Sequence, residues 1–203
     1  MENADNLVPR RTIASNIARY CEEVIKWNAS INLISRGDST NASSLMARHM
    51  ADSAQILDHI PLCSTLLDIG SGSGLPGVVL AIHGVSDVIL IEPDHKKCAF
   101  LRCVATHLRE VHYRVETCRM EDYVHGGVVD IIVSRAFSSC ANIVAGCWHN
   151  ISRNTKVILF KSRAQIDLEI KKMGELYLFD LQVIPSRISN DSVIMIVSSI
   201  VLK

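Results

Sequence analysis

The first third of the chain has apolar residues at helical spacing. Between Ile13 and Ile25 they recur every three or four positions, which predicts a helix with one buried face. A second helix is expected over residues 43–60, ending before Pro61. The pattern predicts an N-terminal helical cap over residues 1–62, packed on a main domain over residues 63–203.

From residue 65 onward, short apolar runs alternate with amphipathic ones. Strands are expected at 65–69, 87–92, 112–117, 130–134 and 156–161, and helices at 76–82, 95–108, 142–150 and 164–174. This alternation is typical of a mainly parallel sheet that helices cover on both faces. Strands 177–184 and 192–202 follow, joined by too few residues for a crossover helix. We therefore expect them to form an antiparallel hairpin at the sheet edge.

The composition fits one globular domain with a helical appendage. The 203 residues are 48% hydrophobic and 21% charged, which supports a sizeable core and excludes a disordered chain. Lys and Arg number 21, and so do Asp and Glu, so the formal net charge is zero. A polybasic coat for nucleic acid is therefore absent from the sequence, and any RNA contact must come from local patches.

Cysteine usage and the chain's N-terminal residues indicate the compartment. Seven Cys form no Cys-x-x-Cys pair, which favours reduced thiols over disulfides or a zinc ribbon. Residues 1–12 lack the apolar core of a signal peptide, and the apolar stretch 193–202 is about half a membrane span long. We expect a soluble cytoplasmic protein with no membrane contact. The histidines show no ligand spacing, so no metal is expected.

The strongest local signal is a glycine-rich turn between the first predicted strand and the next helix. It reads Asp68-Ile-Gly70-Ser-Gly72-Ser-Gly74-Leu-Pro-Gly77. Glycines at such a turn let the backbone approach a ligand closely, and the helix that follows offers unpaired N–H groups. The turn therefore predicts a cofactor site.

Two cofactors compete for this turn. The segment Gly72–Gly77 satisfies the dinucleotide pattern G-x-G-x-x-G, with Glu92 placed to hold a ribose, as in a nicotinamide-dependent oxidoreductase. The whole run instead fits the acid-x-Gly-x-Gly-x-Gly pattern of methyltransferases that use S-adenosylmethionine (SAM). In that case Asp68 meets the ammonium group of SAM and Glu92 binds both ribose hydroxyls. The C-terminal hairpin favours SAM, because SAM methyltransferase sheets end in this way.

Five further motifs accompany the glycine turn: Trp27-Asn28-x-x-x-Asn32-Leu33, Arg48-His49-x-x-Asp52-Ser53, Arg119-Met120-Glu121, Ser134-Arg135-Ala136-Phe137 and Phe160-Lys161. With these motifs the chain resembles a known family, the bacterial small-subunit (16S) rRNA guanine-N7 methyltransferases of the RsmG (GidB) type. The resemblance implies a Rossmann-like SAM-dependent methyltransferase fold, α/β, with a mostly parallel seven-stranded sheet. It also implies small-subunit rRNA, or the small ribosomal subunit, as partner. We expect a monomer.

The resemblance and the turn together assign residues to roles. The expected SAM-binding residues are Asp68, Gly70, Gly72, Leu75, Glu92, Met120, Glu121 and Arg135. Arg135 and Lys161 are expected to position the substrate, and Arg48, His49, Lys161 and Arg163 to contact RNA. Two positions depart from the family pattern: Ser162 follows Lys161 where glycine is usual, and Met120 replaces a smaller aliphatic residue.

The expected chemistry needs no general base, because guanine N7 carries a lone pair and loses no proton on methylation. Methyltransferases of exocyclic amines usually carry a Pro-Pro-aromatic segment where this chain has Ser134–Phe137. Cytosine-C5 enzymes need a thiol nucleophile, whereas Cys140 lacks their flanking residues and is interpreted as a packing residue. A SAM-dependent enzyme acting on a small molecule or a protein remains an alternative, and so does the oxidoreductase.

Overall fold

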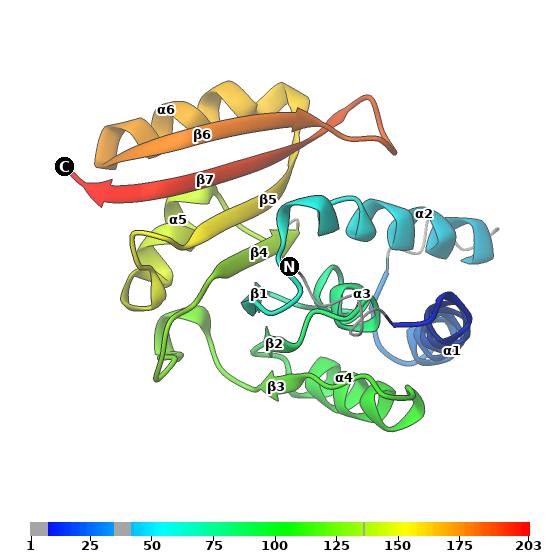
Figure 1. Cartoon of the computed structure of the whole chain (residues 1–203). Helices are drawn as coiled ribbons and strands as arrows, with labels where there is room; N and C mark the ends of the chain where they lie inside the picture. Colours follow the sequence, from blue (N-terminus) through cyan, green and yellow to red (C-terminus); the bar gives the residue numbers. More distant parts are fainter. Residues whose placement is uncertain (1–7, 35–41, 136) are drawn as a thin grey trace.

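The computed structural model describes residues 8–34, 42–135 and 137–203 and contains one seven-stranded sheet between two layers of helices (Figure 1). The strands are β1 (Thr65–Ile69), β2 (Asp87–Ile91), β3 (Arg114–Glu116), β4 (Ile131–Arg135), β5 (Lys156–Ser162), β6 (Tyr177–Pro185) and β7 (Ser192–Leu202). Their order across the sheet is β3-β2-β1-β4-β5-β7-β6. The strands β1 to β5 pair in parallel, and β7 is antiparallel to both β5 and β6. The expected fold class is confirmed.

The strands form because both faces of the sheet are buried. Along β2, Val88 and Leu90 belong to one hydrophobic cluster, while Ile89 and Ile91 belong to the cluster on the opposite face. A strand with helices on both sides needs apolar residues at every position, and this explains the continuous apolar runs in the sequence.

Helices cover the two faces unequally. On one face lie α1 (Arg10–Asn28), α2 (Ala42–Ala54), α3 (Gly77–Ile82) and α4 (His95–His107), and on the other α5 (Cys140–Gly146) and α6 (Ile166–Leu176). Short 3₁₀ turns lie at Leu57–His59, Met120–Asp122, Trp148–Asn150 and Arg163–Gln165. Among the described residues, no helix has the length and apolar character needed to cross a membrane.

Two helices end earlier than the sequence predicts. The second helix was expected to reach residue 60, but α2 ends at Ala54 and a 3₁₀ turn follows. Ile56 and Ile60 are both buried, so helical spacing of apolar residues continues although the backbone has changed. The predicted helix 142–150 likewise ends at Gly146, and the Asn150 amide then donates to the carbonyl of Cys147, three residues back.

The cap helices share a hydrophobic core with the sheet and are joined to it by polar contacts. Tyr20 and Val24 of α1 and Met46 of α2 are fully buried in the cluster that contains Leu66 of β1. Asn16, also fully buried, bonds twice to the backbone of Arg109 beyond the end of α4: its Nδ2 donates to the carbonyl and its Oδ1 accepts from the amide, each at 3.0 Å. The cap is thus fixed to α4, and the boundary between residues 62 and 63 stays a prediction.

Replacing Asn16 tests this attachment. Asn16→Ala removes two hydrogen bonds and leaves two backbone groups without their partner, so the free energy of unfolding should fall by about 2–3 kcal/mol. Urea denaturation measures it. Asn154→Ala, at an exposed position, is the control and should change stability by less than about 0.5 kcal/mol. Equal stability of the two variants would contradict the proposed attachment.

Candidate active site

The carboxylate of Asp68 is buried at the carboxyl end of β1. It is fully buried, and its Oδ2 accepts a hydrogen bond from the amide of Gly77, the first residue of α3, at 2.9 Å. Burial is the main cause that raises the pKa of Asp68 to about 7, and the bond from Gly77 opposes this shift. Among the described residues, its Oδ1 has no hydrogen-bond partner. The side chain therefore joins the strand to the next helix and keeps one oxygen available.

The glycine turn has the backbone that the sequence predicts. Gly70, Gly72 and Gly74 have φ values of 69°, 55° and 93°, which residues with side chains rarely adopt. A Cβ atom at Gly70 would lie 2.4 Å from the ring of Phe137, and one at Gly77 would lie 2.6 Å from Asp68 Oδ2. The turn is consequently closed to side chains at both of these positions.

Glu92 follows β2 at the same edge of the sheet. Its side chain is almost fully buried, and it accepts hydrogen bonds from the amides of Gly72, at 2.8 Å, and Asp94, at 2.9 Å. One bond goes to each carboxylate oxygen, so each oxygen retains a second lone pair. Glu92 is thereby fixed beside the glycine turn, with both of its carboxylate oxygens able to accept a further hydrogen bond.

Tyr20 is a site residue that the sequence reasoning missed. The hydroxyl of this fully buried side chain donates to the Ser73 carbonyl at 2.6 Å and so links α1 to the middle of the glycine turn. Burial raises its pKa well above the usual value, and both Asp68 and Arg135 are close enough to affect it. In the sequence Tyr20 only continued an apolar helical period, so no signal distinguished it from a core residue.

Arg135 ends β4 and faces the cap. Its NH2 lies 2.6 Å from His49 Nδ1, and its Nε lies 3.6 Å from Asp52 Oδ2, both on α2. Because a guanidinium only donates, His49 Nδ1 is the acceptor in this contact. Burial lowers the pKa of Arg135 and raises that of Asp52, while the attraction between their charges opposes both shifts. The structure thus brings the motif that contains His49 and Asp52 into contact with the motif that contains Arg135, although the two are far apart in the sequence.

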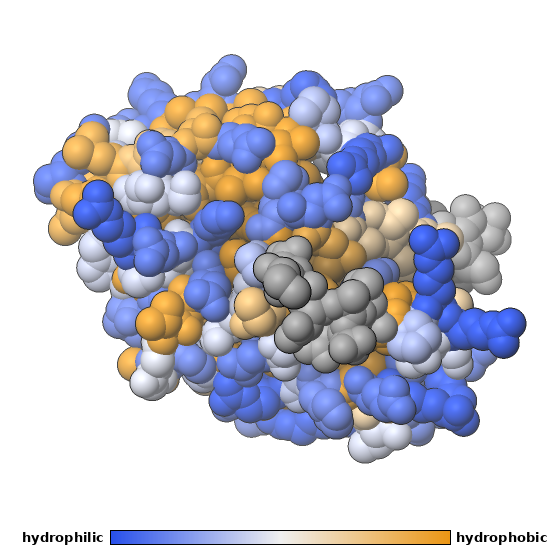
Figure 2. Space-filling view, in the orientation of Figure 1, coloured by the Kyte–Doolittle hydropathy of each residue, from blue (hydrophilic) through white to orange (hydrophobic). Residues whose placement is uncertain are grey.

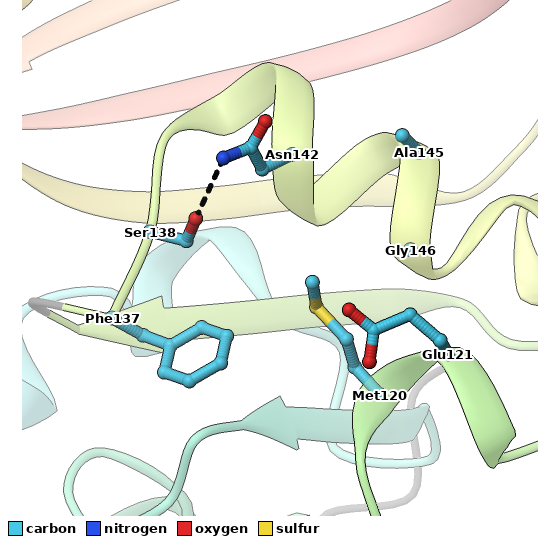
Figure 3. A pocket seen from close by; sticks show the side chains of 7 residues that line it. All are labelled: Met120, Glu121, Phe137, Ser138, Asn142, Ala145 and Gly146. Carbon is cyan, nitrogen blue, oxygen red and sulfur yellow. Dashed lines mark hydrogen bonds between the residues drawn. The ribbon is translucent and has the colours of Figure 1, made fainter.

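A cavity of about 520 Å³ lies next to the glycine turn on the α5 side. Its lining residues are Met120, Glu121, Phe137, Ser138, Asn142, Ala145 and Gly146, and Figure 3 shows Met120 and Glu121 facing the segment that leads into α5. Phe137 also packs on Gly70, so this cavity and the glycine turn adjoin. Met120 and Glu121 were expected at the adenine end of the cofactor, and their position here is compatible with that role.

Comparison with known proteins agrees with this geometry. The GidB family profile, described as rRNA small subunit methyltransferase G, matches residues 13–190. Proteins of that name from Rickettsia typhi and Rickettsia bellii are each 35% identical to the chain. The first alignment covers 89% of this chain and 87% of the relative, and the second covers 95% and 96%. The chain belongs to the rRNA small subunit methyltransferase G family.

Two solved structures of similar fold carry the names of other methyltransferases. Magnesium protoporphyrin IX methyltransferase from Synechocystis, solved with SAM bound, has a TM-score of 0.60 and 14% identity, covering 89% of this chain and 97% of that one. Ribosomal protein L11 methylase from Lactobacillus delbrueckii has a TM-score of 0.59 and 14% identity, covering 78% and 79%. At such identities the likeness concerns the fold, whereas the family membership predicted from the motifs is confirmed by the family profile and the Rickettsia relatives.

In this member of the methyltransferase G family, Lys161 lies in an internal ion pair. Its Nζ is 2.8 Å from Glu169 Oε1 and donates to the Ser138 carbonyl at 2.6 Å, and about a tenth of its side chain is exposed. Glu169 Oε2 in turn accepts from the amide of Cys140 at 2.7 Å. The pair therefore anchors the segment between β4 and α5, whose residues Phe137 and Ser138 line the cavity.

The other residues expected to contact RNA do not share one environment. Arg48 and Arg163 are exposed, and Arg163 Nε donates to the Asn190 carbonyl at 2.9 Å. His49 is half-buried against Arg135. RNA contacts by all four residues, Lys161 included, stay predictions. Ala136 of the family motif lies outside the described residues.

Cys140 is buried, as expected for a packing residue. It is fully buried at the start of α5, and burial, followed by the nearby Glu169 charge, raises the pKa of its thiol to about 12. A thiol in that state is protonated at neutral pH and is a poor nucleophile. The site therefore gives no support to a cytosine-C5 mechanism.

Substitution of Asp68 should separate stability from binding. Its pKa is raised on folding, so the protonated carboxyl stabilises the fold at low pH and this stabilisation is lost as pH rises through about 7. Above pH 7, Asp68→Asn should therefore raise the free energy of unfolding by about 1–3 kcal/mol. The same change should weaken SAM binding, because an amide offers no negative charge to the ammonium group of SAM. Urea denaturation and calorimetric titration on both sides of pH 7 measure the two effects.

The control for this substitution is Asp58→Asn. Asp58 forms an exposed ion pair with Arg187, so its loss should alter neither stability nor SAM affinity appreciably. Unchanged SAM affinity in Asp68→Asn would refute the assigned role.

Glu169→Gln tests the ion pair between Lys161 and Glu169. Losing its charge leaves Lys161 largely buried opposite a neutral group, which should lower the free energy of unfolding by about 2–4 kcal/mol. Adding Lys161→Met should recover much of that loss, because the unpaired charge is then removed. Glu175→Gln, exposed on the same helix, is the matched control with an effect under about 0.5 kcal/mol. An additive loss in the double variant would argue against the pair.

Proposed function

We propose that the chain transfers the methyl group of SAM to N7 of a guanine in small-subunit (16S) rRNA. The family and its Rickettsia relatives are named as small-subunit rRNA methyltransferases, which supports the RNA substrate. The choice of guanine N7 rests on the motifs that resemble the RsmG type, and on a site that offers positioning groups rather than an acid–base pair.

The observation that carries the cofactor assignment is a pair of buried polar atoms. Asp68 Oδ1 and Arg135 NH1 are both buried without a hydrogen-bond partner among the described residues, and both groups lie near the Tyr20 hydroxyl. Unpaired buried polar atoms are costly, and a ligand can satisfy them. One carboxylate and one guanidinium complement the ammonium and carboxylate ends of an amino acid, which SAM carries. Glu92 would hold the ribose, and Met120 and Glu121 the adenine end.

Bound SAM supplies a methyl group on a positively charged sulfur, and the protein's task is to align the acceptor. Guanine N7 attacks with its lone pair and no proton has to be removed, so rate depends mainly on position. Arg135, held by His49 and Asp52, is the group best placed to orient substrate or cofactor at the edge of the sheet. The ion pair of Lys161 and Glu169 would contribute to the alignment of the acceptor by holding the segment between β4 and α5 in place.

The RNA has to be brought to this edge in an unpaired or splayed form. The exposed Arg48 and Arg163 are proposed to contact phosphates, whereas His49 and Lys161 would act first through the protein groups that they touch. An rRNA substrate is consistent with the expected cytoplasmic location and with action as a monomer.

The decisive experiment is nucleoside mass spectrometry of 16S rRNA from cells with and without the gene. Purified protein, SAM and small ribosomal subunits should yield N7-methylguanine, located by chemical cleavage at that base. Arg135→Ala should cut methylation about 10–100-fold, the equivalent of one lost charge-assisted contact. Arg135→Lys should stay impaired, because lysine restores the charge but not the planar fork.

The control is Arg153→Ala, an exposed arginine on a turn away from the site, which should keep full activity. The rate should also lack a pH-dependent limb due to a catalytic base. Methyl groups on cytosine C5 or on an exocyclic amine, methylation of a metabolite instead of subunits, or full activity of Arg135→Ala would each overturn the proposal.

A further inference from the structure

Three potential metal ligands converge where α1 packs on α4. Glu23 comes from α1, and Cys103 and His107 come from α4. One ligand atom of each lies within 4.8 Å of the other two. Cys103 and His107 are four residues apart, so they share one face of the helix.

The carboxylate of Glu23 is already oriented by its neighbours. Trp27 Nε1 donates to its Oε2 at 3.2 Å, and its Oε1 lies 3.6 Å from His107 Nδ1. The ring of Trp27 is itself held edge-on against Phe100 of α4, with ring centroids 5.8 Å apart. Metal-binding carboxylates are typically supported by a second hydrogen bond of this kind, which leaves one oxygen for the ion.

We propose that Glu23, Cys103 and His107 form a site for a zinc ion that joins the helical cap to the main domain. A thiolate, an imidazole and a carboxylate are the ligands that zinc prefers, and three protein ligands leave a fourth position for water. Ligand atoms around tetrahedral zinc are roughly 3.3–3.8 Å apart, given bonds of about 2.0–2.3 Å. The spacing of Glu23 and His107 already lies in this range, and small side-chain rotations would bring the three donors to it.

The local charges set the conditions for binding. Lys26 Nζ lies 3.7 Å from Glu23 Oε1 and competes with the ion for that oxygen, but its side chain is 71% exposed and can move into solvent. Arg19, one turn earlier on α1, is committed to the His107 carbonyl at 3.1 Å. The Cys103 thiol must lose its proton to bind zinc, so affinity should rise with pH.

The proposed ligands lie on α1 and α4, and the hydrogen bonds between Asn16 and Arg109 join α1 to the chain just beyond the end of α4. Zinc bound to ligands on both helices would therefore hold the cap against α4, and an ion that binds only the folded chain raises the melting temperature. No metal was expected from the sequence because the spacing of potential ligands along the chain was the only guide. Glu23 is remote from Cys103 and His107 in the sequence, so that spacing did not reveal the cluster.

The test uses the full chain, purified with chelator and reducing agent, and titrated with zinc chloride. One ion per chain should bind, with a rise in melting temperature. Cobalt(II) should give the thiolate charge-transfer band and the visible bands of a tetrahedral site. His107→Gln and Glu23→Gln should each weaken zinc at least about 10-fold. Cys103→Ser should abolish the thiolate band, and Lys26→Ala should strengthen binding.

Cys63→Ser is the matched control, because Cys63 is an exposed cysteine outside the cluster. It should leave zinc affinity and the cobalt spectrum unchanged. The proposal is overturned if zinc does not bind, if Cys63→Ser rather than Cys103→Ser removes the thiolate band, or if His107→Gln retains wild-type affinity. Because His107 is exposed, this last variant should fold even if Cys103→Ser does not.

Discussion

The geometry of the site depends on the burial of one carboxylate, Asp68. Its bond to the Gly77 amide fixes where α3 begins, and a side chain at residue 77 would collide with it. Asp68 and Leu66 lie on the same face of β1, the face that meets the cap, so the carboxylate of Asp68 is enclosed by apolar neighbours. This burial lowers the stability of the fold, which a neutral residue would avoid, and it leaves the Oδ1 atom of Asp68 without a hydrogen-bond partner among the described residues.

The walls around that position come from both layers of helices. The cap supplies Tyr20 to the glycine turn and His49 to Arg135, so α1 and α2 act on β1 and β4 from one face. On the other face, Glu169 of α6 acts through Lys161 on the segment that carries Phe137. Neither layer is merely a cover for the sheet, since each fixes groups that border the site.

The sequence predicted the strands, the hairpin and the glycine turn well, because burial on two faces and positive φ values each leave a local pattern. It was less informative about groups whose partners lie elsewhere in the chain. Tyr20 continued an apolar period as any core residue would. Lys161 was expected to position substrate and contact RNA, and nothing in the sequence indicated that Glu169 would lie beside it. The end of α2 was missed because Ile56 and Ile60 remain buried after the helix stops, so the hydrophobic pattern continues when the hydrogen bonding does not.

The hydrogen bonds that side chains of α1 make to the main domain are directed at main-chain atoms. Asn16 bonds to the amide and carbonyl of residue 109, Arg19 to the carbonyl of residue 107, and Tyr20 to the carbonyl of residue 73. Every amino acid except proline offers both of these groups, so positions 73 and 109 can change during evolution without loss of the contact. Asn16 and Tyr20 cannot change in this way. Correlated substitution between the two sides of this interface should therefore be weak, and methods that infer contacts from paired changes would underestimate how firmly the helices are joined.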